Sequence, residues 1–249
     1  SLATPAEGLA AGRRTIVQAE LADPAGAAAP MTSSPMRIVV CGTDTDVGKT
    51  VVSAWLVQGL QATYWKPVQS GLDEGGDRDR ICQLLNLPPE RWLREAYAFR
   101  RPLSPHWAAE CDGAELDPAC LGLPPCNGPL VVETAGGLMV PLNRSWLQID
   151  QLQRWQLPVV LVARSGLGTL NHTLLSLEAL RHRGIAVLGL ILNGPPHADN
   201  PGTLEQFGGI PVLAQLPPLN PLDAHALDRQ WRQQGLSTKF RQLLAPARS

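Results

Sequence analysis

The chain has 249 residues, of which 44% are hydrophobic and 17% are charged, a composition that excludes disorder for most of its length. Lysine and arginine total 21 and aspartate and glutamate total 22, so no global basic field exists to hold nucleic acid or an anionic membrane. Because the apolar runs are far shorter than the ~20 residues of a membrane span, and the five cysteines form no C-x-x-C pair, we expect a soluble, cytoplasmic protein without a zinc site or disulfide scaffold.

Residues 1–35 are rich in alanine, glycine, proline and serine and contain one short apolar stretch, at residues 15–17. This composition is typical of a flexible extension, and the segment lacks the continuous apolar core of a secretory signal. We expect a flexible or non-native extension over residues 1–35, with a translation start near Met31 or Met36 as an alternative. A single domain is expected over residues 36–249.

From residue 36 onward, short apolar runs alternate with stretches of helical periodicity. The runs predicted as strands are residues 37–41, 63–68, 130–133, 158–163, 185–193 and 211–216. The stretches predicted as helices are residues 48–60, 79–87, 104–111, 145–155, 168–183 and 223–234. Several of the strands are apolar on both faces, as in a sheet that is covered on both sides. The alternation predicts a doubly wound α/β fold, with a mostly parallel sheet and helices on both faces.

The first predicted strand leads directly into the segment GTDTDVGKT at residues 42–50. A strand, a glycine-containing loop and a helix that opens with GKT form a phosphate cradle of backbone N–H groups, in which Lys49 would reach the terminal phosphates and Thr50 would ligate Mg²⁺. The strict pattern G-x-x-x-x-G-K-[ST] has a glycine at the position of Thr43, whereas here Gly42 precedes that position by one residue. The segment predicts a nucleoside triphosphate site of the phosphate-loop type, and the alternative is a chance GKT at an ordinary helix start.

Five segments together resemble the dethiobiotin synthetase family, the ATP-dependent ligases of biotin synthesis. They are GTDTDVGKT at 42–50, KPVQSG at 66–71, SPH at 104–106, VETAGG at 132–137 and LGTLNH at 167–172. The family carries KPV-x-[ST]-G, SPH, VEGAGG and LG-x-x-NH in the same order, and the resemblance covers residues 37 to about 220. Thr134 stands where the family has glycine.

The resemblance implies an ATP-dependent cyclo-ligase that converts 7,8-diaminononanoate, CO₂ and MgATP to dethiobiotin, ADP and phosphate. One amine of the substrate would trap CO₂ as a carbamate, whose oxygen attacks the γ-phosphate. The second amine would close the ring on the resulting carbamic–phosphoric anhydride. Small molecules are thus the expected substrates, and neither nucleic acid nor membrane is an expected partner.

The chain has only three lysines, Lys49, Lys66 and Lys239. Lys66 follows a predicted strand and should project from the carboxyl edge of the sheet, where ligands of such folds bind. The resemblance implies that Lys49 and Lys66 are the catalytic residues, with Lys66 binding the carbamate and the transferred phosphoryl group. Thr45 and Ser70 would contact the nitrogen and carbamate region of the substrate.

A carboxylate at the end of the predicted strand 130–133, Glu133, can ligate Mg²⁺ opposite the phosphate loop. The family places an aspartate at the start of the helix after the KPV segment. Asp79 fits this position best because apolar residues continue the helix after it; Asp77 is the alternative, and a plain N-cap is the other interpretation of either. The expected metal ligands are therefore Thr50, Asp79 and Glu133.

Asn193 ends a predicted strand, and the resemblance implies that it reads the edge of adenine, with Gly194 and Pro217 beside the base. An asparagine–glycine turn without a ligand is the alternative. The expected nucleotide-binding residues are Asp46, Val47, Gly48, Lys49, Thr50, Val51, Asp79, Glu133, Asn193, Gly194 and Pro217.

The LGTLNH turn resembles a turn that lies at the two-fold interface of the family. It implies a homodimer in which residues 166–172 of one subunit, Gly168 included, close the substrate site of the other. The alternative is a turn that only begins a helix within its own subunit. Two other classes share the fold: ParA/MinD-like ATPase switches carry a lysine at the position of Asp44, and cobyric-acid-type synthetases need a glutaminase domain, for which we expect no room after residue 220.

Overall fold

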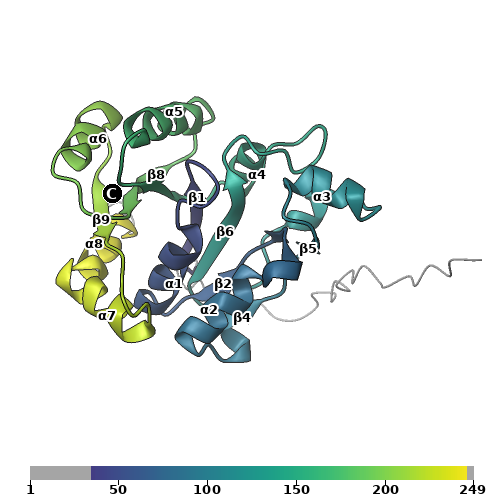
Figure 1. Ribbon diagram of the computed structural model, residues 1–249, viewed down its shortest axis with the longest axis horizontal. Helices are drawn as coiled ribbons and strands as arrows, with labels where there is room; N and C mark the ends of the chain where they lie inside the picture. Colours follow the sequence, from purple (N-terminus) through teal and green to yellow (C-terminus); the bar gives the residue numbers. More distant parts are fainter. Residues whose placement is uncertain (1–34, 246–249) are drawn as a thin grey trace, which may run out of the picture. The chain divides into compact units, whose positions relative to one another are not determined.

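The computed structural model describes residues 35–245, and the centre of this part is a seven-stranded sheet (Figure 1). The strand order is β4-β2-β6-β1-β7-β8-β9, and every pair of neighbours is parallel. The prediction of a doubly wound, parallel sheet is therefore confirmed. The extension expected over residues 1–35 lies outside the described residues, apart from Pro35.

The strands of the main sheet are β1 (Arg37–Gly42), β2 (Thr63–Trp65), β4 (Trp92–Leu93), β6 (Leu130–Gly137), β7 (Val159–Arg164), β8 (Val187–Asn193) and β9 (Val212–Leu216). A second, two-stranded parallel sheet consists of β3 (Val68–Gln69) and β5 (Tyr97–Ala98). The single strand predicted over residues 63–68 is thus divided into β2 and β3. The division falls at Pro67, which has no N–H group to donate to a neighbouring strand.

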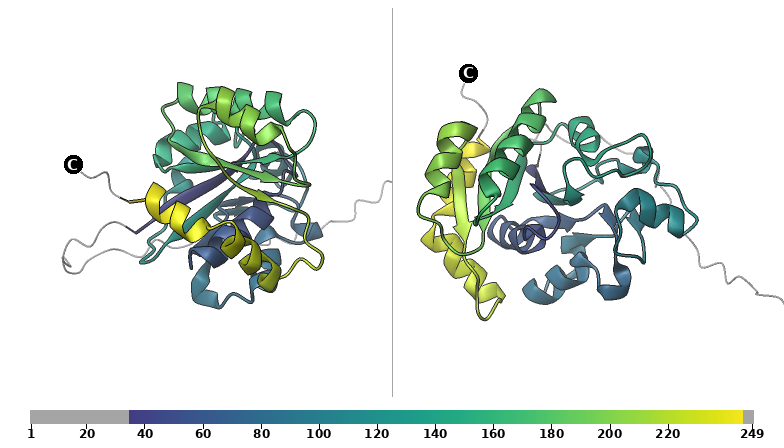
Figure 2. Two further views of the ribbon diagram at one scale, coloured as in Figure 1. Left: turned by 90° about the vertical axis from the view of Figure 1, so that its left-hand side faces the viewer. Right: turned by 45° about the horizontal axis from the view of Figure 1, so that its top comes forward.

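Two layers of helices cover the sheet, as Figure 2 shows. The helices packed on one face are α1 (Lys49–Gly59), α2 (Asp77–Leu85), α7 (Ala224–Gln233) and α8 (Leu236–Leu243). Those on the other face are α3 (Pro105–Cys111), α4 (Gln148–Trp155), α5 (Thr169–His182) and α6 (Asn200–Gly208). Three short 3₁₀ turns, η1 (Leu72–Glu74), η2 (Pro89–Arg91) and η3 (Pro118–Leu121), lie in the connections. No helix in residues 35–245 is long and apolar enough to span a membrane.

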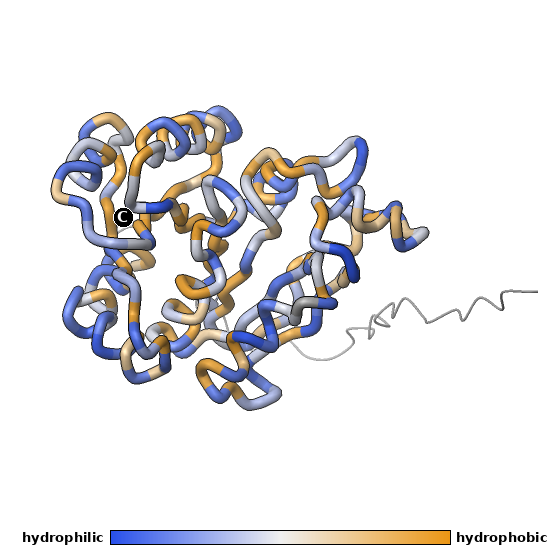
Figure 3. The backbone as a smooth tube through the Cα atoms, in the orientation of Figure 1, coloured by the Kyte–Doolittle hydropathy of each residue, from blue (hydrophilic) through white to orange (hydrophobic). Residues whose placement is uncertain are grey.

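Successive residues of β1 belong to different hydrophobic cores. Ile38 and Val40 pack with α1, whereas Val39 and Cys41 pack in the core on the opposite face, and all four are fully buried. This arrangement explains why the strand is apolar at every position, since side chains of a strand alternate between two covered faces. Figure 3 shows the hydrophobic residues concentrated along the central strands and on α1.

Helices α6 and α8 were not predicted, and α2 begins two residues earlier than expected. The start of α6 is Asn-Pro-Gly, a sequence typical of turns, although proline is well tolerated in the first turn of a helix. Gly235 has a left-handed φ of 63° and separates α8 from α7, and Leu236 and Phe240 of α8 are fully buried. The burial of these two side chains, which depends on tertiary contacts, holds α8 in place.

Helices α1 and α7 approach closely at Gly59. A Cβ atom on Gly59 would lie 2.3 Å from the ring of Trp231. That ring stacks on Phe240 at a centroid distance of 5.7 Å and meets Trp55 edge-on at 6.0 Å, so it has no room to move aside. Trp55 in turn donates a hydrogen bond of 2.9 Å to the carbonyl of Leu227 in α7. The contact therefore requires a glycine in α1.

We expect Gly59→Ala to destabilise the protein by about 1–3 kcal/mol, because overpacking against a fixed ring outweighs the better helix propensity of alanine. Gly202→Ala in α6 is the matched control, because no atom lies within 4 Å of the added Cβ; it should stabilise by up to about 1 kcal/mol. Urea unfolding of both variants checks the pair. Equal stabilisation in both would contradict the close packing of α1 on α7.

Candidate active site

The segment between β1 and α1 folds into a tight loop at the carboxyl edge of the sheet. Gly48 has a φ of 93°, and a Cβ atom there would lie 2.1 Å from Nδ2 of Asn193. A glycine is therefore needed both for the left-handed backbone and for the close approach of β8. Asp46 also has a left-handed φ, of 57°. Gly42 is tightly enclosed as well, because an added Cβ would lie 3.0 Å from both the carbonyl of Asp44 and the side chain of Lys49.

Three side chains hold carbonyl groups of this loop from outside. Lys49 Nζ donates to the carbonyl of Asp44 at 2.8 Å, Arg164 Nη2 to that of Thr45 at 3.3 Å, and Asn193 Nδ2 to that of Val47 at 3.1 Å. In a trans peptide the C=O and the following N–H point in opposite directions. Fixing these carbonyls therefore fixes where the next N–H groups point.

The N–H groups of Asp46, Val47 and Gly48 donate to no group within residues 35–245. They lie immediately before α1, whose N-terminus carries partial positive charge. Several free N–H donors beside a helix N-terminus and a buried lysine form an arrangement that binds phosphate. Burial lowers the pKa of Lys49, against the opposing effect of Glu133.

A cluster of buried polar side chains lies next to the loop. Glu133, in β6, has a fully buried side chain. Its Oε1 accepts hydrogen bonds from Thr50 Oγ1 at 3.0 Å and from Lys66 Nζ at 3.1 Å, and its Oε2 accepts one from the hydroxyl of Tyr64 at 3.0 Å. Lys66 also pairs with the carboxylate of Asp77. One ammonium group is thus enclosed by two carboxylates, directly beside the threonine of the loop.

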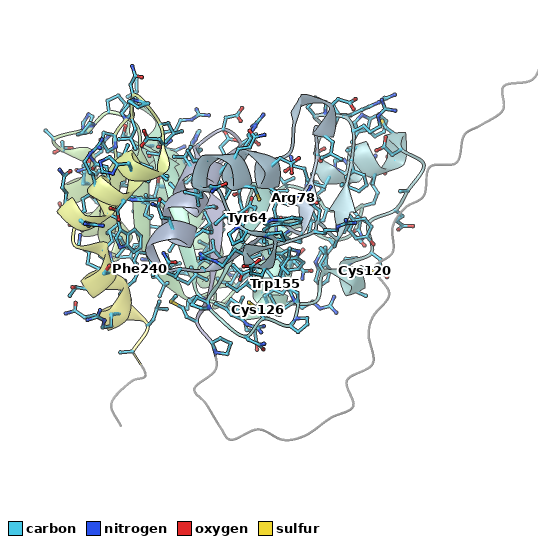
Figure 4. All side chains as sticks on the ribbon, turned by 90° about the horizontal axis from the view of Figure 1, so that it is seen from below. Tyr64, Arg78, Cys120, Cys126, Trp155 and Phe240 are labelled. Atoms are coloured by element: carbon cyan, nitrogen blue, oxygen red, sulfur yellow. The ribbon has the colours of Figure 1, made fainter. Side chains whose placement is uncertain are left out.

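The charges of this cluster change the acid–base properties of its members. Burial alone would lower the pKa of Lys66, but Glu133 and Asp77 outweigh it and raise that pKa. Burial would likewise raise the pKa of Asp77, but the Lys66 ammonium outweighs it and lowers that pKa. Burial and the neighbouring Glu133 raise the pKa of Tyr64, which Figure 4 labels, well above its usual range. Lys66 therefore remains an ammonium and Tyr64 remains a hydrogen-bond donor at neutral pH.

The structure brings Asp77 to this cluster and does not bring Asp79. The side chain of Asp79 is 58% exposed and pairs with Arg78 at 3.1 Å, whereas that of Asp77 is 14% exposed. The reason is the first turn of α2, where Gln69 Oε1 accepts the N–H of Asp77 at 3.1 Å and fixes the helix start at that residue. Two residues later the helix has turned by about 200°, so Asp79 points to the opposite side.

Asn193, Gly194 and Pro217 lie together at the ends of β8 and β9. Asn193 pairs with Leu216 in the sheet register, and the N–H of Gly194 donates to the carbonyl of Leu216 at 2.9 Å. A Cβ on Gly194 would lie 2.5 Å from the hydroxyl of Ser165, and its φ of 133° is one that side chains rarely adopt. The structure thus places Asn193 directly beside Gly48, with Gly194 and Pro217 at the ends of the same two strands.

A small cavity of about 40 Å³ connects the phosphate loop with the LGTLNH turn of the same chain. Its lining residues are Thr43, Asp44, Val47, Arg164, Leu167, Gly168, Thr169 and His172. Gly168 has a left-handed φ of 91° at the start of α5. Ser70, the other expected substrate contact, has a buried hydroxyl without a hydrogen-bond partner within residues 35–245.

The donor set of the cluster fits Mg²⁺. Thr50, Asp77 and Glu133 offer hard oxygen ligands, which Mg²⁺ prefers, and Mg²⁺ takes one or two carboxylates together with phosphates and water. Residues 35–245 contain no group of three or more histidine, cysteine or acidic side chains placed to hold a metal ion.

Tyr64 and Arg164 are parts of the site that sequence reasoning missed. Tyr64 stands two residues before Lys66, so both side chains lie on one face of β2 and its extension. That spacing was a usable signal. Arg164 ends β7 at the same edge of the sheet, but nothing in its surrounding sequence indicates a contact with the loop.

Comparison with known proteins agrees with this arrangement. A family model described as an AAA domain matches residues 36–226. The ATP-dependent dethiobiotin synthetase BioD of Rhodopseudomonas palustris (strain BisB18) is 52% identical over 196 residues, which are 79% of this chain and 94% of that protein. The biotin biosynthesis bifunctional protein BioCD of Bordetella avium (strain 197N) is 54% identical over 195 residues, 78% of this chain and 42% of that protein.

Among solved structures, the septum site-determining protein MinD of Pyrococcus horikoshii OT3, complexed with Mg-ADP, has a TM-score of 0.52 and 14% identity, with 84% of this chain and 94% of that chain covered. This similarity shows the phosphate-loop fold alone. The family is shown by the dethiobiotin synthetase of Rhodopseudomonas palustris, because the chain is 52% identical to it and the match covers 94% of its length. The chain belongs to the dethiobiotin synthetase family.

Proposed function

We propose that the protein catalyses the MgATP-dependent carboxylation and ring closure of 7,8-diaminononanoate with CO₂, which gives dethiobiotin, ADP and phosphate. The observation that carries the proposal is the enclosed ammonium of Lys66, held by Glu133 and Asp77 directly beside Thr50 of the phosphate loop. A cation fixed at this position meets the charge that develops when a phosphoryl group is transferred.

The first step needs one substrate amine, which adds to CO₂ and loses a proton to give a carbamate. A carbamate oxygen then attacks the γ-phosphorus, and ADP leaves. The second amine attacks the carbonyl carbon of the mixed anhydride and loses a proton, and phosphate leaves as the ring closes. ATP is required because a carbamate oxygen is a poor leaving group until it is phosphorylated.

The residues of the phosphate loop bind the polyphosphate. The N–H groups of Asp46, Val47 and Gly48, which donate to no group in the described part of the chain, face the phosphates, and Lys49 exchanges the carbonyl of Asp44 for a phosphate oxygen. Val51, in the first turn of α1, adds to the same cradle. Lys49 and Lys66 together offset the charge of the transferred phosphoryl group.

Thr50, Glu133 and Asp77 are the residues that would hold Mg²⁺. The ion, when bound, neutralises charge on the phosphates. We assign the third ligand to Asp77 in place of Asp79, because only the Asp77 side chain faces Lys66 and Glu133.

Separate residues are assigned to the carbamate region of the diamine substrate and to the base of the nucleotide. Thr45 and Ser70, whose hydroxyl has no hydrogen-bond partner among the described residues, are the contacts for the carbamate region. At the nucleotide, the Nδ2 group of Asn193 is engaged by Val47, which leaves Oδ1 as an acceptor for the amino group of adenine. Gly194 and Pro217 form the surface beside the base.

We further propose that the active unit is a homodimer in which the Gly168 turn of one subunit closes the substrate site of the other. Leu167 is fully exposed and Leu175 is 57% exposed, and both are large apolar side chains beside this turn. Burial of such side chains under a second subunit removes apolar surface from water and stabilises the dimer.

Lys49→Ala should abolish turnover while the unfolding transition stays unchanged, because the ammonium that grips the β- and γ-phosphates is lost. Lys49→Arg should not restore activity, since a planar guanidinium cannot replace a compact ammonium inside the loop. Steady-state phosphate release checks both variants. Activity near that of the parent protein in either variant would rule out the phosphate-loop assignment.

Asp77→Asn and Glu133→Gln should each raise the Mg²⁺ concentration needed for half-maximal activity, by roughly 10–100-fold as for other perturbed metal sites. Asp79→Asn is the matched control and should leave this concentration unchanged, because its carboxylate pairs with Arg78 at the surface. A magnesium titration at saturating ATP makes the comparison. Sensitivity at Asp79 with none at Asp77 would reverse our assignment.

Mixing two inactive variants tests the shared site. In a mixed dimer of Lys66→Ala and Gly168→Trp, one site keeps both wild-type residues, so equimolar mixing should restore roughly a quarter of the activity. Lys66→Ala mixed with Lys49→Ala is the control and should stay inactive, because both lysines belong to the site of one chain. If subunit exchange is verified and the first mixture stays inactive, the shared site is wrong and the ATP chemistry is unaffected.

A further inference from the structure

The register of β2 and β6 brings Tyr64, in β2, and Lys66, directly after it, to the carboxylate of Glu133 in β6. Tyr64 pairs with Val131 in the parallel ladder, and Glu133 follows Val131 by two residues, on the same face. Lys66 follows Tyr64 by two residues, again on that face. The hydroxyl of Tyr64 and the Nζ of Lys66 therefore reach the Glu133 carboxylate from the same face of one strand. The hydroxyl lies 3.0 Å from Oε2, and Nζ lies 3.1 Å from Oε1.

The two oxygens of Glu133 have different partners. Oε1 accepts from Thr50 and Lys66, the residues of the phosphate-binding side. Oε2 accepts from Tyr64, and within residues 35–245 it has no other donor. A carboxylate rotates easily about its last side-chain bond, so the hydrogen bond from the phenol to one oxygen fixes the rotational angle of the group and thereby the direction of the other oxygen, toward the phosphate loop. Since Glu133 and Tyr64 are both fully buried, water cannot take the place of this hydrogen bond.

We propose that Tyr64 is a positioning residue of the metal site, which acts by fixing the carboxylate of Glu133 so that Oε1 faces Thr50. This inference rests on the proposed function, in which Glu133 helps to hold Mg²⁺. Partners of this kind orient a ligand and raise its affinity for the metal without touching the metal themselves.

A purely structural role for Tyr64 would have a different consequence. The phenol would then only satisfy one buried oxygen, and its loss would lower stability without a specific effect on the metal. The positioning role predicts the opposite, namely a loss of Mg²⁺ affinity that exceeds any change in nucleotide binding.

The experiment is the binding of ADP to the full chain by calorimetry, in EDTA and over a series of MgCl₂ concentrations. For Tyr64→Phe we expect ADP affinity in EDTA within about twofold of the parent protein, because the phosphate loop is intact. The MgCl₂ concentration that gives half of the maximal tightening should rise by about tenfold or more. Tyr97→Phe, which removes the other tyrosine hydroxyl of the chain, is the control and should behave as the parent protein does.

An unchanged magnesium response in Tyr64→Phe would overturn the inference, as would an equal loss of affinity in EDTA and in MgCl₂. A parent protein whose ADP affinity does not respond to MgCl₂ would instead contradict the metal role in the proposed function, so the two failures are distinguishable.

A second comparison covers the case in which Tyr64→Phe alone does not fold. The double variant Tyr64→Phe/Glu133→Gln has no buried carboxylate that requires a phenol donor. If Tyr64 acts only through Glu133, this double variant and Glu133→Gln alone should have the same magnesium response. A further tenfold loss in the double variant would show that Tyr64 acts independently of Glu133, and would overturn the inference.

Discussion

A carboxylate enclosed by protein has to find its donors within the protein, because no water reaches it. Glu133 meets this requirement with Thr50 from α1, Tyr64 from β2 and Lys66 from the end of β2. Removing any one of these leaves a buried charge less well compensated, which is far more costly than the loss of a surface ion pair. The positions of α1, β2 and β6 relative to one another are therefore tied to this one side chain.

The order of the strands explains how these residues meet. β1 lies in the middle of the sheet, between β6 and β7. After β1 the chain first builds β2, β4 and β6 on one side of it, and then β7, β8 and β9 on the other side. The loops after β1, β2, β6, β7 and β8 open at the same edge of the sheet, which is the binding position in doubly wound folds. The residues to which we assign phosphate, metal and base binding come from separate strands of the sheet and meet at this edge.

The sequence allowed the fold to be predicted, and with it the position of the loop after β1, of Lys66 and of Glu133 at the carboxyl edge of the sheet, because each is marked by a local pattern at the end of an apolar strand. It favoured Asp79 over Asp77, since the start of α2 depends on Gln69, eight residues earlier, accepting the N–H of Asp77. The contact of Arg164 with Thr45 joins residues 119 positions apart, and no periodicity or motif reports such a contact. Local signals located the loop after β1, Lys66 and Glu133, whereas the contacts of Asp77 and Arg164 depend on tertiary packing.

The contact between Asn193 and Gly48 has a consequence for redesign. The amide that we propose reads the base also holds the carbonyl of Val47 and packs against the Cα of Gly48, with no space for even a methyl group between them. Any side chain introduced at position 193 to favour a different base would also displace the phosphate loop or release its carbonyl. In the mode of nucleotide binding that we propose, base preference and phosphate binding therefore depend on the same contact, and an altered base preference would require compensating changes in the loop itself.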